Sequence, residues 1–474
     1  MPVSPAYRPA PRFPDLGAEF ADPVAAADFP KTLLRFRNDR AASTVGLETL
    51  SNGEWTAHFG RFQPLPDNLD PPLALRYHGH QFRSYNPDLG DGRGFLFAQL
   101  REAGTDRLLD LGTKGSGQTP WSRSGDGRLT LKGGVREVLA TAMLEALGVP
   151  TSRSFSLIET CEALERNDEP SPTRAAVLVR LSHSHIRFGT FQRHAYFEAK
   201  DRIGALIDYA IAHYYPELTE AQDRPAALLG AVVARAAHLT ARWMAAGFVH
   251  GVLNTDNMNL TGESFDYGPY RFLPHSDPNY VAAYFDQTGL YSFGRQPEAV
   301  FWNLQQLAGC LTLVTGSDAL VGALNGFAPA YRAELAGAML ARLGVGSVGE
   351  AEDAALAQAA FRALAEGGER LRWEPFFFDW FCGDAPRAMG GPRGAIYSEP
   401  AFGEFRARLA DHAPVRPGRL DAKVFAHPDP EELLYDEIEA LWAPIAQADD
   451  WSPFQAKLAR IEAARLAWRL DGVD

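Results

Sequence analysis

Cysteine is scarce in this sequence, with only three residues among 474, at Cys161, Cys310 and Cys382. They lie far apart and form no Cys-x-x-Cys pair. This spacing excludes a disulfide framework of the kind found in small secreted domains, and it excludes a cysteine zinc site. A chain with so few thiols fits a reducing compartment, and we expect a cytoplasmic protein.

Long apolar runs are also missing. The longest helix-like apolar stretch, residues 226–247, is interrupted by Arg235, His238 and Arg242. These charges and the imidazole predict a buried helix and not a membrane span. The first twenty residues are rich in proline and lack the apolar core of a signal peptide. We therefore expect no membrane partner.

The sequence has no excess of positive charge. Its 46 lysines and arginines stand against 59 aspartates and glutamates, which gives a formal net charge of −13. This balance argues against nucleic acid or an anionic membrane surface as the main partner. It leaves room for a phosphate ligand, because a few well-placed cations can hold one locally.

The order of the predicted elements indicates an α+β protein in two parts. An extended, proline-rich arm (1–33) precedes a strand-rich region (34–195) that contains one clear helix at 134–147. Helical periodicity dominates after Tyr196, over 196–340 and again over 341–474. The predicted strands are 94–100, 108–112, 154–159 and 175–181, and the predicted later helices are 205–214, 225–246, 297–315, 329–343, 349–366, 431–442 and 453–470.

A glycine-rich segment precedes the first of these strands and contains Gly90, Gly92 and Arg93. Alternating glycines let backbone N–H groups approach a phosphate closely, although a glycine-rich hairpin alone is more often a plain turn. Lys114 follows the next strand, and Glu137 lies 23 residues later on the predicted helix. A strand lysine and a helix glutamate after a glycine-rich loop form the ATP-phosphate arrangement of protein kinases.

A second kinase-like pattern follows the long helix. His250, Asn257 and Asp266 stand at the offsets of the kinase catalytic loop and metal-binding aspartate. The position of the kinase base is Val252, which cannot accept a proton. Asn257 and Asp266 carry oxygens that suit Mg²⁺ or Mn²⁺, and Asp256 is the nearest carboxylate that could replace the base. His250 is expected to be structural.

Two arginines, Arg180 and Arg187, flank the segment Ser182–Ile186. Guanidinium groups grip phosphate oxygens with two parallel hydrogen bonds, but ordinary salt bridges explain such arginines equally well.

Together these motifs resemble the selenoprotein O family of protein adenylyltransferases with a pseudokinase fold. The matching stretches are Tyr77–Arg93, Lys114–Arg128, Arg136–Arg153, Ser184–Phe191, Gly247–Asn257, Phe265–Pro269 and Tyr291–Leu307. They lie between residues 75 and 310, and we expect residues 341–474 to form a diverged helical region.

The resemblance implies a protein-kinase-like two-lobed fold, with an N-lobe at 34–195, a helical C-lobe at 196–340 and a helical C-terminal extension. It also implies transfer of AMP from ATP to Ser, Thr or Tyr hydroxyls of protein substrates, with the nucleotide flipped relative to kinases. UMP transfer from UTP with manganese is a related activity in the family, and the resemblance leaves both open.

The resemblance also assigns roles to particular residues. Asp256 would be the proton acceptor, Asn257 and Asp266 would hold Mg²⁺ or Mn²⁺, and Glu137 would pair with Lys114. The implied ATP contacts are Gly90, Gly92, Arg93, Lys114, Asp126, Gly127, Arg180, Arg187 and Asp266. An atypical kinase and a catalytically inactive nucleotide-binding scaffold are the alternatives. Family members often end in a cysteine- or selenocysteine-containing tail, whereas the last cysteine here is Cys382, which argues against redox control through the tail.

Overall fold

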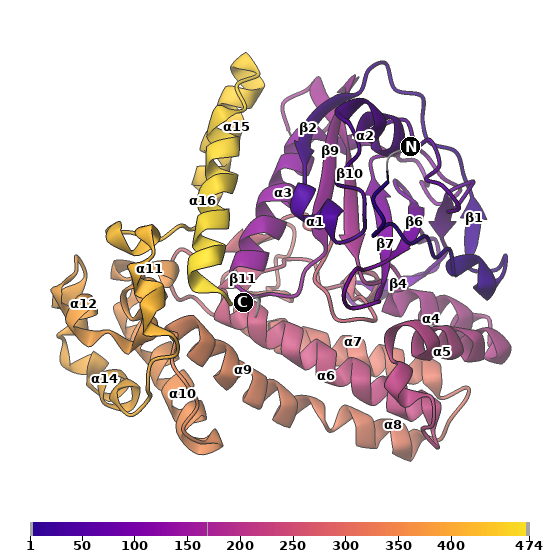
Figure 1. Ribbon diagram of the computed structural model, residues 1–474. Helices are drawn as coiled ribbons and strands as arrows, with labels where there is room; N and C mark the ends of the chain where they lie inside the picture. The colour runs from indigo at the N-terminus through magenta and orange to yellow at the C-terminus, as the bar shows by residue number, and fades with distance from the viewer. Residues whose placement is uncertain (1–2, 168, 471–474) are drawn as a thin grey trace.

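An antiparallel sheet of eight strands forms the centre of the first part of the chain (Figure 1). This computed structural model describes residues 3–167 and 169–470. The strands follow the order β1-β3-β6-β7-β10-β9-β2, and β8 pairs with β10. Their bounds are β1 Ala21–Pro23, β2 Leu33–Arg37, β3 Leu73–Leu75, β6 Leu96–Arg101, β7 Leu108–Lys114, β8 Leu129–Thr130, β9 Arg153–Leu164 and β10 Thr173–Ser182.

All four predicted strands are present, as β6, β7, β9 and β10. The central strands β7 and β10 are buried along nearly their whole length, because both faces of the sheet are covered. Two short hairpin-like pairs stand outside the sheet: β4 Gly79–Gln81 with β5 Ser84–Asn86, and β11 Phe248–Val249 with β12 Arg271–Phe272.

Three helices, and not one, accompany the sheet. The predicted helix is α3 (Leu131–Ala146), whose first turn is capped by the Thr130 hydroxyl. The expectation of a single helix in this region was wrong, because α1 (Asp39–Ser43) and α2 (Asn52–Phe59) cover the other face. On that face Trp55 of α2 stacks on Phe155 of β9, with ring centroids 4.8 Å apart. The sheet is therefore a middle layer with apolar packing on both sides.

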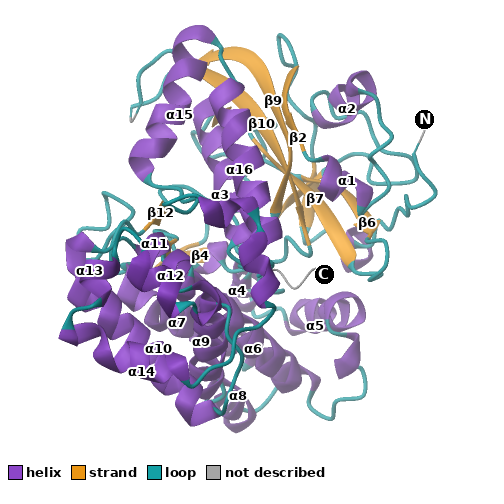
Figure 2. Cartoon of the chain, turned by 60° about the vertical axis from the view of Figure 1, so that its left-hand side comes forward, coloured by secondary structure: helices purple, strands orange, loops and turns teal. Residues whose placement is uncertain are grey.

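Helices form the second part of the chain, below the sheet in Figure 2. The longest is α6 (Arg224–Ala245), which is capped by the Asp223 side chain and has Pro225 in its first turn. Its apolar face is buried, as the sequence pattern predicts. The other helices are α4 Phe188–Tyr196, α5 Lys200–Tyr214, α7 Gln296–Leu311, α8 Ser317–Leu324, α9 Phe327–Leu343, α10 Glu350–Gly367, α11 Trp373–Asp379, α12 Ala385–Gly390, α13 Gly394–Tyr397 and α14 Gly403–Ala410.

The last two helices, α15 (Tyr435–Ala448) and α16 (Ser452–Trp468), return to the sheet. Both views place α16 alongside α3 (Figures 1 and 2). Asp449, between the two helices, pairs with Arg35 of β2 and Arg174 of β10 at 3.0 and 2.6 Å. The C-terminal helices thus support the helix that carries Glu137.

The described residues of the N-terminal arm lie along the sheet. Its β1 pairs with β3, and the Ala27 N–H donates to the Ser116 carbonyl oxygen. Residues 1–2 of the predicted arm, 168 in the loop between β9 and β10, and 471–474 of the C-terminal region lie outside the described residues. Within 3–167 and 169–470, no helix is both long enough and apolar enough to cross a membrane.

Candidate active site

A buried lysine joins the sheet to the segment after α6. Lys114 is the last residue of β7, and its Nζ donates to Glu137 Oε1 on α3 and, at 2.5 Å, to Asp266 Oδ1. The Lys114 and Glu137 side chains are 5% and 2% exposed. The structure therefore forms the ion pair that the resemblance implies and adds Asp266 to it. Lys114 carries one positive charge between two carboxylates.

The segment that connects α6 to this cluster is held by hydrogen bonds from His250. The imidazole Nε2 lies 3.0 Å from the Phe265 carbonyl oxygen, and the backbone N–H of His250 donates to Gln296 Oε1. Burial lowers the pKa of His250, which favours a neutral ring. His250 thus has the structural role expected of it, since it ties the loop before Asp256 to the loop before Asp266.

Asn257 and Asp266 present oxygens that fit a divalent cation. Asn257 belongs to the short helix η3 (Thr255–Asn257), and its Nδ2 donates to the Val252 carbonyl oxygen at 2.9 Å. This hydrogen bond fixes the amide so that its Oδ1 remains available as a ligand. Asp266 has φ +64°, an unusual backbone conformation for a residue with a side chain, which is often retained at functional sites.

The charge around Asp266 is strongly positive. Burial opposes ionisation of this carboxyl, but the charges of Lys114, Arg180 and Arg93 outweigh burial and hold its pKa well below the usual range. Asp266 is therefore a carboxylate at neutral pH. No group of three or more His, Cys, Asp and Glu side chains suited to a metal occurs among the described residues. A cation here would complete its shell with phosphate oxygens or water.

Asp256 lies beside this cluster with an unused oxygen. The residue is 8% exposed, and its Oδ1 is buried with no hydrogen-bond partner among the described residues. Burial raises its pKa to about 6, although the Arg187 charge acts in the opposite direction. Gly79 leaves the space next to this carboxylate, because a Cβ there would lie 3.1 Å from Asp256 Oδ1. A buried acceptor of this kind is suited to receive a proton.

Arg180 and Arg187 both point into the cluster. Arg180 Nη1 lies 3.5 Å from Asp266 Oδ1. Arg187 donates to the main-chain oxygen of Asp256 at 3.1 Å and to the Asp91 carboxylate at 3.2 Å. The Nε of each arginine is buried without a partner among the described residues. Buried donors left unpaired carry a desolvation cost, so these groups fit an anion that they would bind.

The glycine-rich loop packs under a tryptophan. A Cβ on Gly90 would lie 2.3 Å from the Trp121 ring, and one on Gly92 would lie 2.8 Å from the Trp121 carbonyl oxygen. The Ser122 hydroxyl also donates to the Gly92 carbonyl oxygen at 2.5 Å. Arg93 is exposed and makes no ion pair or side-chain hydrogen bond within 3–167 and 169–470. The loop is therefore fixed while its arginine is available.

Asp126 and Gly127 make contacts outside the lysine cluster. The Asp126 carboxylate pairs with Arg166 at 2.8 Å, and its side chain is 45% exposed. Asp126 also borders a separate cavity with Glu162. Gly127 has φ +70°, and a Cβ there would overlap Gly117. Within the described ranges no hydrogen bond or ion pair joins either residue to Lys114 or Asp266.

Several residues near the site were not predicted from the sequence. Tyr77 and Phe265 sandwich the Arg187 guanidinium, at 4.4 and 5.0 Å from the ring centroids. The Asp91 side chain is 11% exposed and pairs with the same arginine. Arg123 is exposed, and its charge, like that of Arg187, partly opposes the burial that raises the pKa of Asp256. Asp91 stands between the two glycines of the glycine-rich segment, so its position could have drawn attention to it.

A family model described as "Protein adenylyltransferase SelO" matches residues 6–386 of the chain. The chain belongs to the SelO family. Curated SelO-family relatives carry the name "Protein nucleotidyltransferase YdiU". The protein from Gloeobacter violaceus is 47% identical over 472 residues, covering 96% of this chain and 94% of its own. Those from Synechocystis and Aeromonas hydrophila are 43% and 37% identical, covering 96% and 92% of this chain and 98% and 89% of their own.

These alignments extend beyond the blocks at residues 75–310. A family model that reaches residue 386 and relatives that align over 96% of the chain include much of the C-terminal helical region. The resemblance to the family therefore continues beyond the blocks from which it was inferred, at least to residue 386. As a SelO-family member, the chain is a protein nucleotidyltransferase.

Proposed function

We propose that this enzyme transfers AMP from ATP to Ser, Thr or Tyr hydroxyls of proteins. The observation that carries the proposal is the unpartnered, buried Asp256 Oδ1 beside the Lys114–Asp266 cluster, with Val252 at the position of the kinase base. A kinase base at that position would activate a hydroxyl toward the γ-phosphate. Its absence, with a carboxylate four residues later, fits a nucleotide held in a different orientation, flipped relative to kinases.

The arrangement of the elements supports the interpretation that the chain has a kinase-like fold of two lobes. The sheet with α3 supplies Lys114 and Glu137, and the segment after α6 supplies Asp256, Asn257 and Asp266. On this reading residues 34–195 are the N-lobe, 196–340 the C-lobe and 341–474 a helical extension that supports α3.

In the proposed complex the cations bind phosphate. Lys114, Arg180 and Arg187 would grip phosphate oxygens, Arg93 would close over them, and the backbone of Gly90 and Gly92 would border the nucleotide. Asn257 and Asp266 would hold Mg²⁺ or Mn²⁺, which supplies charge neutralisation on the phosphates. We also propose that Asp126 and Gly127 contact ATP. For this contact the Asp126 carboxylate would have to break its salt bridge with Arg166.

The proposed reaction is a displacement at the α-phosphorus. Asp256 accepts the proton of the acceptor hydroxyl, the hydroxyl oxygen bonds to the α-phosphorus, and the bond to the β-phosphate oxygen breaks. Pyrophosphate leaves, and AMP remains on the protein. Arg180 and Arg187 stabilise the charge that develops on the transferred group, because they are already oriented in a buried site.

Labelled ATP tests this proposal. Incubation with Mg²⁺ and candidate proteins should incorporate label from α-labelled ATP and none from γ-labelled ATP. Label from the γ position alone would show an atypical kinase, and no label from either would show a nucleotide-binding scaffold. Parallel incubation with UTP and Mn²⁺ decides between AMP and UMP as the preferred group.

A second prediction concerns the glycine-rich loop. Gly90→Ala should lower kcat/KM for ATP by about 10- to 100-fold, because the added methyl displaces a loop that touches the nucleotide. Trp121→Ala in the same chain should restore part of this loss, since the clash is with the Trp121 ring. Gly230→Ala on α6, where nothing lies within 4 Å, is the control. Equal kinetics for Gly90→Ala and Gly230→Ala would remove the loop from the nucleotide site.

A further inference from the structure

The Asp256 carboxylate depends on its main chain for its orientation. Its Oδ1 has no hydrogen-bond partner among the described residues, and the residue belongs to η3, a helix of a single turn. So short a helix gains little stability from its own hydrogen bonds. Contacts from outside η3 must therefore hold Asp256 in place, and they come from β4 and α4, which pack against η3.

A closed ring of hydrogen bonds joins these three elements through Thr255, the residue before Asp256. The Thr255 hydroxyl accepts the backbone N–H of His80 on β4 at 2.7 Å and donates to Gln192 Oε1 on α4 at 2.5 Å. The ring closes where Gln192 Nε2 donates to His80 Nδ1 at 2.7 Å. The elements β4, α4 and η3 are thus tied together directly beside the proposed proton acceptor.

Only one arrangement of protons satisfies every member of the ring. A backbone N–H always donates, so the Thr255 oxygen accepts from His80 and its own proton goes to the Gln192 carbonyl oxygen. The Gln192 amide then offers an N–H to His80 Nδ1, which must carry no proton. Burial lowers the pKa of His80, which favours this neutral ring. A network in which each group has its partner holds its elements rigidly.

The ring lies where its loss would affect Asp256. Thr255 and Gln192 are buried, at 0% and 4% exposed. Without the Thr255 hydroxyl, the His80 N–H and the Gln192 carbonyl oxygen would lose their partners in surroundings that exclude water. Gly79 precedes His80 on β4 and lies so close to Asp256 that an added Cβ would be 3.1 Å from its Oδ1. A shift of β4 therefore moves a wall of the site as well as η3.

The proposed metal ligand Asn257 is held separately from the ring. Its Nδ2 donates to the Val252 carbonyl oxygen at 2.9 Å, and its backbone N–H donates to the Asn254 carbonyl oxygen at 3.0 Å. The Asn254 side chain in turn accepts the Tyr291 hydroxyl at 2.9 Å. Opening the ring should therefore disturb Asp256 and leave the metal ligand, and with it ATP binding, nearly unchanged.

We propose that Thr255 and Gln192 are positioning residues, whose ring with His80 holds the Asp256 carboxylate toward the acceptor hydroxyl. They act through Asp256, and the inference rests on its proposed role as proton acceptor. A general base works only within hydrogen-bond reach of the proton that it accepts, so a shift of about 1 Å lowers the rate of transfer by up to about 100-fold. Such a shift leaves ATP binding intact, because the proposed phosphate contacts are not part of the ring.

Two substitutions of Thr255 separate the hydroxyl from the shape of the side chain. Thr255→Val keeps the shape without the hydroxyl and should lower kcat by about 10- to 100-fold, with KM for ATP and the half-maximal Mg²⁺ concentration unchanged. Thr255→Ser keeps the hydroxyl and should retain nearly the kcat of the wild type. Steady-state kinetics of the full chain, with α-labelled ATP and the best acceptor protein from the labelling experiment, measure these constants. A wild-type kcat for Thr255→Val, or equal losses for Thr255→Val and Thr255→Ser, would overturn the proposal.

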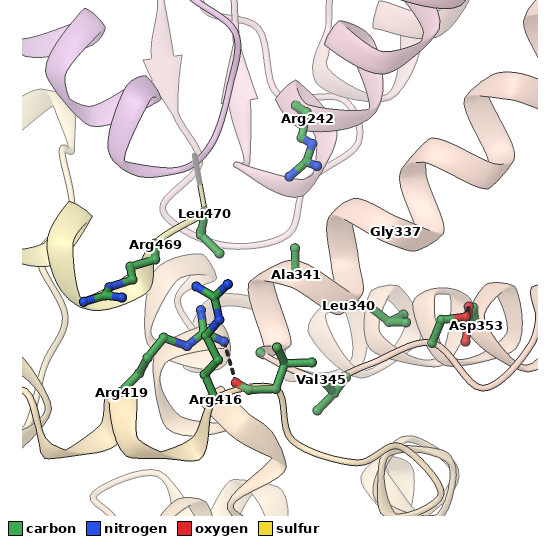
Figure 3. A pocket seen from close by; sticks show the side chains of 13 residues that line it. Arg242, Gly337, Leu340, Ala341, Val345, Asp353, Arg416, Arg419, Arg469 and Leu470 are labelled. Atoms are coloured by element: carbon green, nitrogen blue, oxygen red, sulfur yellow. Dashed lines mark hydrogen bonds between the residues drawn. The ribbon is translucent and has the colours of Figure 1, made fainter. Parts of the chain in front are cut away.

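Two controls remove hydroxyl groups elsewhere in the chain. Thr240→Val changes a buried residue of α6 whose hydroxyl donates to a carbonyl oxygen of its own helix. Ser347→Ala removes the hydroxyl that donates to Asp353. Figure 3 shows Asp353 at the wall of a pocket whose lining residues include none of the ring or of the candidate active site. Both variants should have the kinetics of the wild type.

A double variant tests whether Thr255 acts through Asp256. In a chain that already carries Asp256→Asn, the change Thr255→Val should lower kcat by no more than about threefold, because no base remains to be positioned. An equal loss with and without Asp256→Asn would show a separate role of Thr255 and contradict the proposal. If Thr255→Val folds poorly, Gln192→Met opens the same ring and should give the same loss of kcat and the same dependence on Asp256.

The same kinetics separate this inference from the proposed function. A wild-type kcat for Asp256→Asn would overturn the role of Asp256 itself. A large loss in Asp256→Asn together with wild-type kinetics in Thr255→Val and Gln192→Met would overturn only the positioning ring.

Discussion

Asp256→Asn is expected to lower kcat for AMP transfer by about 100- to 10,000-fold, the usual contribution of a positioned general base. The substitution keeps the size of the side chain, and it keeps the hydrogen bond from Arg187 because that bond goes to the main-chain oxygen. What it removes is the carboxylate oxygen that has no partner among the described residues of the buried site. Steady-state kinetics with a fixed protein acceptor measure the effect.

The separate effects on kcat and KM distinguish a role of Asp256 in proton transfer from a role in ATP binding. KM for ATP should stay close to that of the wild type, because Asp256 is proposed to contact the acceptor hydroxyl and not the phosphates. Asp318→Asn, at an exposed position on α8, serves as the matched control and should leave both constants unchanged. A kcat for Asp256→Asn within about threefold of the wild type would exclude Asp256 as the proton acceptor.

The fold could be predicted where a local pattern is regular. Asp223, Pro225 and the apolar spacing that follows mark α6 directly in the amino-acid sequence. In contrast, α11 is a run of large residues that is buried along its whole length, so it has no polar face and no helical period. Short α2 carried a readable signal in the Ser51–Glu54 capping box, but eight residues give little periodicity to support it.

The candidate site was predictable as a set of residue types and not as a geometry. Lys114 and Glu137 stand 23 residues apart in the sequence, and no spacing rule predicts that their side chains meet. Their contact was predicted from the order of the motifs, in which a strand lysine and a helix glutamate follow a glycine-rich loop. Asp126 shows the limit, because its partner Arg166 lies in the loop between β9 and β10, which has no recognisable pattern in the sequence. The packing of Trp121 on Gly90 is likewise a tertiary contact between two loops.

Lys114 balances the negative charges of two carboxylates in the candidate active site. It is the cation shared by Glu137 and Asp266, and Glu137 Oε2 has no partner among the described residues of the buried site. The neighbouring Arg180 reaches Asp266 only at 3.5 Å. Removing the lysine therefore leaves Glu137 without its cation in surroundings that exclude water, which is a far larger penalty than the loss of a surface salt bridge.

Lys114→Met should lower the free energy of unfolding by about 3–5 kcal/mol, the range for breaking a buried ion pair by removing one partner. Denaturant unfolding of the full chain without nucleotide measures this, so that lost ATP binding does not enter the comparison. Lys114→Met with Glu137→Gln should be more stable than Lys114→Met alone, because no unpaired carboxylate then remains on α3.

Lys132→Met is the control. Lys132 lies on α3, as Glu137 does, and forms a partly exposed salt bridge with Glu439, so its loss should lower the free energy of unfolding by no more than about 1 kcal/mol. If Lys114→Met and Lys132→Met unfold at the same denaturant concentration, the buried cluster contributes no more to stability than a surface pair, and its role would be confined to the ligand.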